Sequence, residues 1–100
     1  MSFDVSIKHG TLEEDLGNYT YNCHGMMTAS GVRLRSINGL QGSEAAILIQ
    51  HAYTWMVEHE ARCRAMEPDN GWGDYEGWLG FVRKILEVCK QNPDATLTVS

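Results

Sequence analysis

The chain has few of the residues that mark unusual protein classes. Its 100 residues include only two prolines, which argues against a proline-rich linker or a disordered segment. The longest apolar run is Ala45 to Ile49. A membrane-spanning helix needs about 20 such residues, so none is expected. The first residues, from Met1 to Ile7, contain an acid and no apolar run. A targeting peptide is therefore not expected at this end.

Cysteine and basic residues are also scarce. The three cysteines are far apart and odd in number, which does not fit a disulfide framework, so reduced thiols and a cytoplasmic location are predicted. Eight Lys and Arg face thirteen Asp and Glu, and the net charge is −5. Such a chain lacks the basic surface that binds duplex nucleic acid. An acidic surface instead suits a basic patch on a protein partner.

What is present predicts one globular domain over residues 1–100. Hydrophobic residues make up 43% of the chain, enough for one modest core at this length. Strands are predicted where apolar and polar residues alternate, at Phe3 to Ile7 and at Ala95 to Val99. The β-branched and aromatic run at 18–23 predicts a further strand.

Helical spacing dominates the rest of the chain. A short helix is expected over 24–30, then a connecting loop over 32–42. Ser43 is the expected N-cap of a long helix that ends before Pro68. Its apolar stripe is predicted to comprise Ala45, Leu48, Ala52, Trp55, Met56 and His59.

Another helix is expected from Asp74 to the Asn92-Pro93 pair. Its stripe comprises Tyr75, Leu79, Val82, Leu86 and Cys89, widened by Trp78 and Ile85. These elements together predict an α+β fold, in which two main helices pack on one face of a small two- to three-stranded sheet.

Three aromatic residues gather within seven positions, at Trp72, Tyr75 and Trp78. Stacked on a base, with Arg33 and Arg35 on its phosphates, they would bind a small nucleotide. The same aromatics also suit a core or an oligomer interface, with Asn70 and Gly71 forming a positive-φ turn and Trp72 covering the core. The predicted ligand or partner-binding residues are Asn70, Trp72, Tyr75, Arg33 and Arg35.

His59 and Cys63 lie one helical turn apart and would share a zinc ion if Cys23 or His24 completed the set. Such a pair is more often a surface histidine and a buried thiol than two ligands of a metal ion. No catalytic residue, metal ligand or cofactor is therefore assigned. The chain is predicted to bind and not to catalyse.

The order of several short motifs resembles a family of short bacteriophage and prophage proteins. The most specific part is the Pro-x-Asn-Gly-Trp-Gly-x-Tyr-x-Gly block at 68–77. The other parts are Asn18 to Asn22, Met26-Met27, Ile37 to Ala45, Cys89 and Asn92 to Ala95.

The resemblance implies an accessory protein that acts in the cytosol of a host bacterium. Phage proteins of this size are often antagonists of antiviral defence. The expected partner is a bacterial defence protein that is inhibited, or a small nucleotide signal that is sequestered. Duplex nucleic acid and membranes are not expected partners. The chain is expected to form a homo-oligomer. The alternatives are a small metal-dependent hydrolase built on His59, Glu60 and Cys63, and a phage structural or assembly protein.

Overall fold

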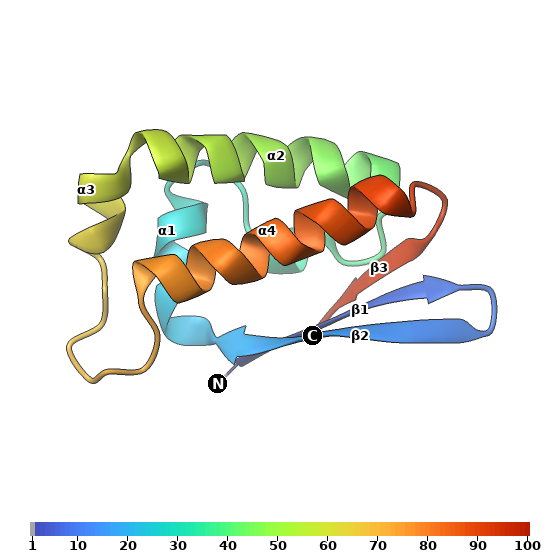
Figure 1. The fold of residues 1–100 in the computed structure, drawn as a ribbon, viewed down its shortest axis with the longest axis horizontal. Helices are drawn as coiled ribbons and strands as arrows, with labels where there is room; N and C mark the ends of the chain where they lie inside the picture. The colour runs from blue at the N-terminus through green and yellow to red at the C-terminus, as the bar shows by residue number, and fades with distance from the viewer. Residues whose placement is uncertain (1) are drawn as a thin grey trace.

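A computed structural model, which describes residues 2–100, contains a three-stranded antiparallel sheet with the main helices on one face (Figure 1). The strands are β1 (Ser2–His9), β2 (Leu12–Thr20) and β3 (Thr96–Val99), in the order β2-β1-β3. The α-helices are α1 (His24–Thr28), α2 (Gly42–Glu58), α3 (Glu60–Arg64) and α4 (Tyr75–Gln91). Two 3-10 turns, η1 (Tyr21–Cys23) and η2 (Leu34–Ile37), complete the chain. The predicted α+β fold is confirmed.

The central strand β1 has one buried and one exposed face, as its alternation predicts. Phe3, Val5 and Ile7 are buried on the side of the helices, and Asp4 faces solvent. Strand β3 pairs with β1 and buries Leu97 in the same layer. The sheet therefore contributes one apolar face to the core and leaves the other to solvent.

Strand β2 differs from its prediction at both ends. It begins at Leu12, directly after a tight turn, so the acidic run at 13–15 belongs to the strand. A register shift opposite Val5 and Ser6 places Gly17 at φ 106°, a value that glycine adopts easily. The strand ends at Thr20, because η1 already turns the chain toward α1.

The outer edge of β3 is covered by the segment between η2 and α2. The Leu97 N–H donates to the Leu40 carbonyl at 2.9 Å, and the Val99 N–H donates to the Asn38 side chain at the same distance. Residues 32–42, predicted as a loop, thus contain η2 and close one edge of the sheet. Closed edges cannot pair with other chains.

Helix α2 begins one residue before the predicted cap. Gln41 is the N-cap in place of Ser43, and its N–H donates to the Glu44 carboxylate at 3.2 Å. Two members of the predicted stripe, Leu48 and His59, are exposed. The buried stripe consists of Ala45, Ile49, Ala52 and Met56.

Helix α4 buries the stripe that its sequence predicts, with Leu79 only half-buried at its margin. Its N-cap is Asp74, whose carboxylate accepts from the Gly77 N–H at 2.7 Å. Near its C-terminus it approaches α2 so closely that a Cβ on Gly42 would lie 2.8 Å from the Cys89 carbonyl oxygen. Within residues 2–100, no helix has the length and apolarity needed to cross a membrane.

Candidate functional site

The predicted site residues occupy three different places. Arg33 and Arg35 line one cavity, and Asn70 and Trp72 line a second. Tyr75 lies in the core. The structure therefore does not bring the five residues together, because η2 and the loop before α4 contribute to different cavities.

Tyr75 is unavailable to a ligand. Its hydroxyl donates to the Met56 carbonyl at 3.0 Å, and its N–H donates to the Glu67 carboxylate at 2.8 Å. Burial raises the pKa of the Tyr75 phenol, with a smaller contribution from the nearby Glu60 charge. The residue fixes α4 to α2, which is a structural role.

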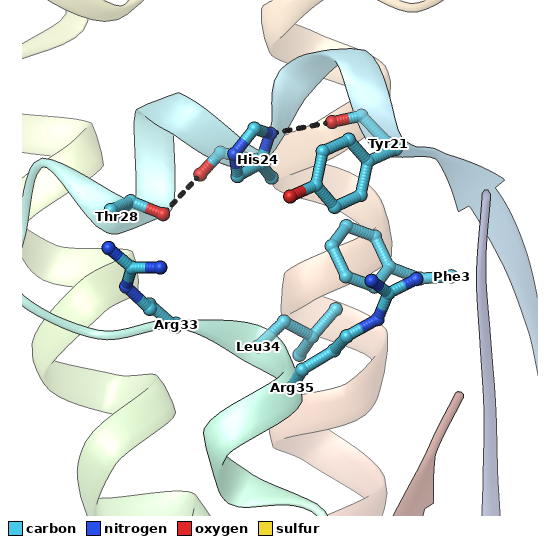
Figure 2. Close-up of a pocket in the computed structure, with 7 residues that line it drawn as sticks. All are labelled: Phe3, Tyr21, His24, Thr28, Arg33, Leu34 and Arg35. Carbon is cyan, nitrogen blue, oxygen red and sulfur yellow. Dashed lines mark hydrogen bonds between the residues drawn. The ribbon is translucent and has the colours of Figure 1, made fainter. Parts of the chain in front are cut away.

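The first cavity, here called the arginine cavity, has a volume of about 210 Å³ and lies between β1, α1 and η2. Figure 2 shows its side chains arranged around an open centre. The lining residues are Phe3, Tyr21, His24, Thr28, Arg33, Leu34 and Arg35.

One wall of the arginine cavity is a pair of stacked rings. The rings of Tyr21 and His24 have centroids 4.0 Å apart and planes 27° apart. His24 Nδ1 lies 2.9 Å from the Tyr21 carbonyl oxygen (Figure 2). A carbonyl only accepts, so Nδ1 carries the proton of a neutral His24 and Nε2 is left as the free ring nitrogen. The start of α1 thus fixes both rings.

The two arginines project from either side of a buried residue. The backbone of Arg33 is extended, and the next residue, Leu34, is buried. The side chains of Arg33 and Arg35 therefore face outward on either side of Leu34. The Arg35 guanidinium lies 5.1 Å from the centroid of the Phe3 ring and 5.3 Å from that of Tyr21. Within residues 2–100, neither arginine forms an ion pair with a carboxylate.

The second cavity, here called the tryptophan cavity, has a volume of about 400 Å³ at the end of β2. The side chains of residues 2–100 that line it are uncharged. Most of them are polar, and one is an exposed indole. The residues are Ser2, Asn18, Tyr19, Thr20, Asn22, Asn70 and Trp72.

The exposed indole is that of Trp72, which is 68% exposed and so does not cover the core. The backbone N–H of Trp72 donates to the side-chain amide oxygen of Asn70 at 2.9 Å. Gly71 has φ 76°, which confirms the positive-φ turn, but Asn70 does not share this conformation. At Gly73 a Cβ would lie 2.6 Å from a Thr20 methyl carbon, so the loop passes tightly against β2.

His59 and Cys63 lie in different surroundings, since His59 is exposed and Cys63 is buried. The His59 ring stacks on Trp55 at 4.1 Å, and its Nδ1 lies 2.8 Å from the Trp55 carbonyl oxygen. Cys63 is buried, and burial raises the pKa of its thiol. No group of three or more potential metal ligands occurs in residues 2–100.

Several lining residues were missed by the sequence analysis. Tyr21 and His24 were missed because 18–23 was interpreted as one strand, which hides their contact at i and i+3. The three-residue spacing of an aromatic and a histidine after Thr20 was the available signal. No comparable signal marked Asn18 and Asn22 as cavity-lining residues, because asparagine at a strand end is ordinarily a turn residue.

Comparisons with protein-family models, with curated proteins and with solved structures each return no match for this chain.

Proposed function

We propose that the chain is a non-enzymatic binding protein that captures a small phosphorylated molecule of the nucleotide class in the arginine cavity. The observation that supports this most is the pair Arg33 and Arg35, free of carboxylates within residues 2–100, beside the Tyr21–His24 stack. A guanidinium group binds phosphate oxygens through two parallel hydrogen bonds. An aromatic ring adds a stacking face for a base.

The size of the arginine cavity suggests how such a ligand is held. About 210 Å³ is below the roughly 300–1,000 Å³ of sites that enclose a whole drug-sized molecule. The phosphate is expected between the arginines, and the base beside the Tyr21–His24 stack. Among residues 2–100, no carboxylate lines the cavity beside His24, so these residues do not include the paired base and acid of a hydrolytic triad.

The biological part of the proposal depends on the resemblance to phage accessory proteins. Inside an infected bacterium, a protein that binds a nucleotide signal lowers its free concentration and silences the defence that responds to it. Sequestration needs affinity and abundance, and no turnover. This is the form of defence antagonism that the arginine cavity favours.

Titration calorimetry with AMP as the probe tests the proposal. Arg33→Ala and Arg35→Ala are each expected to weaken AMP binding at least tenfold, since each removes a charge-assisted contact with phosphate. Arg83→Ala is the matched control, because Arg83 is an exposed arginine of α4 outside this cavity. Wild-type affinity in the Arg33→Ala/Arg35→Ala double variant would overturn the proposal.

A second candidate is inhibition of a basic defence protein by the open face of the sheet. Asp4, Glu13 and Asp15 line a depression of about 400 Å³ on this face. An assay of phage growth on a strain with the relevant defence separates the two. Nucleotide capture predicts loss of antagonism in Arg33→Ala/Arg35→Ala, and protein inhibition predicts loss in Glu13→Lys/Asp15→Lys.

A further inference from the structure

The tryptophan cavity has a different chemistry from the arginine cavity. Among residues 2–100, no charged side chain lines it, so these residues offer no cationic side chain to a phosphate or a carboxylate. Its volume of about 400 Å³ falls within the range of small-molecule sites. This lining favours an uncharged group with hydrogen-bonding edges.

Not all of the polar groups in the cavity are free. The Thr20 hydroxyl accepts from the Asn22 backbone N–H at 3.3 Å, and the side-chain amide oxygen of Asn70 accepts from the Trp72 backbone N–H. Within residues 2–100, the side-chain amides of Asn18 and Asn22 have no hydrogen-bond partner. Each amide offers a donor and an acceptor side by side in one plane.

The loop that carries the exposed Trp72 is fixed by contacts on both sides of this residue. A single exposed tryptophan is ordinary, since much of any protein surface is apolar. Here the backbone of Trp72 is fixed at both sides, by the hydrogen bond from its N–H to the Asn70 side chain and by the close approach of Gly73 to Thr20. The Asp74 N–H, just beyond, donates to the Tyr19 hydroxyl at 3.1 Å. The backbone that carries the indole is thus fixed beside the cavity.

We propose that the tryptophan cavity binds an uncharged nucleobase, which stacks on Trp72 while the asparagine amides bind its edge. A planar amide matches the adjacent donor and acceptor of a base such as adenine. Stacking of a base on an aromatic side chain contributes to binding of unpaired bases in many nucleic-acid-binding proteins. This inference goes beyond the proposed function, because it concerns another cavity and holds even if the arginine cavity binds nothing.

Adenosine is the probe of choice, because it carries a base without the phosphate that the arginine cavity would bind. Calorimetric titration is expected to show adenosine binding that Trp72→Ala weakens at least tenfold and Trp72→Phe weakens less. Asn22→Ala should weaken it as well. Trp55→Ala serves as the control, since Trp55 lies on α2 outside both cavities. Arg33→Ala/Arg35→Ala should leave adenosine binding unchanged.

Three outcomes would overturn the inference. The first is no binding of adenosine at millimolar concentration, and the second is equal binding by the wild type and by Trp72→Ala. The third is displacement of adenosine by methyl glucoside, which would identify a sugar site. Because Trp72 is exposed, a melting temperature equal to that of the wild type confirms that the variant is folded.

Discussion

The Tyr19 hydroxyl and the backbone of Asp74 form a reciprocal contact between β2 and the start of α4. The Asp74 N–H donates to the Tyr19 oxygen at 3.1 Å, and that oxygen lies 3.4 Å from the Asp74 carbonyl, to which it donates. The two residues are 55 positions apart in the chain. This contact fixes the end of the 70–73 loop, and therefore the position of Trp72 at the tryptophan cavity.

Removal of the Tyr19 hydroxyl should weaken the attachment of the 70–73 loop without creating a cavity in the core. Tyr19→Phe keeps the ring contacts with Trp78 and Phe81 but loses both hydrogen bonds. We expect a loss of about 1–2 kcal/mol in the free energy of unfolding, measured with urea. Tyr53→Phe is the control, because the Tyr53 hydroxyl makes no hydrogen bond within residues 2–100. Equal stability of the two variants would show that the contact contributes nothing.

The two tryptophans that flank the start of α4 should respond in opposite ways to truncation. Trp78 is fully buried, so Trp78→Ala is expected to cost roughly 3–5 kcal/mol as a large-to-small core change. Trp72 is exposed, so Trp72→Ala should change stability by no more than about 0.5 kcal/mol. Thermal unfolding of both variants is sufficient. A large loss of stability in Trp72→Ala would mean that the loop supports the core.

The periodicity of the sequence predicted the layers because burial follows a simple rule on each element. Phe3, Val5 and Ile7 alternate, and the residues of α4 recur every three or four positions, so one face of each had to be buried. The same reasoning misplaced Leu48, which the sequence does not distinguish from Ile49. Which of two neighbouring apolar residues turns inward depends on the rotation of α2 against α4, and that rotation is set by contacts such as Gly42 with the α4 backbone.

The cavities were less predictable than the layers. Arg33 and Arg35 are close in sequence, and their joint cavity followed from that spacing. Their aromatic neighbours come from β1 and α1, which no local pattern connects with η2. The separation of Arg33 from Trp72 is likewise a property of the tertiary arrangement. Sequence spacing thus identified residues that line cavities but not which cavity each residue lines.

Two glycines of α4 provide a matched pair for substitution. At Gly77 a Cβ would meet the Tyr19 hydroxyl, whereas at Gly80 it would meet nothing within 4 Å. Gly80→Ala should therefore stabilise the protein by about 0.5–1 kcal/mol, since alanine favours the helix. Gly77→Ala should destabilise it, and Tyr19→Phe in the same chain should recover part of that loss. Equal effects at 77 and 80 in urea unfolding would contradict the close approach of β2 to α4.

Ionisation of the Cys89 thiol should lower the stability of the protein in alkaline solution. Burial raises the pKa of the Cys89 thiol from 9.0 to about 11, so the folded state keeps its proton where the unfolded state loses it. The contribution is fully present below pH 9 and is lost as the pH rises toward 11, which amounts to about 2–3 kcal/mol in all. Cys89→Ala removes this titration, so its free energy of unfolding should fall less steeply than that of the wild type between about pH 8 and pH 10.5, a range that spans the ordinary thiol pKa. Parallel curves in urea unfolding would show that the Cys89 thiol ionises equally in the folded and unfolded states.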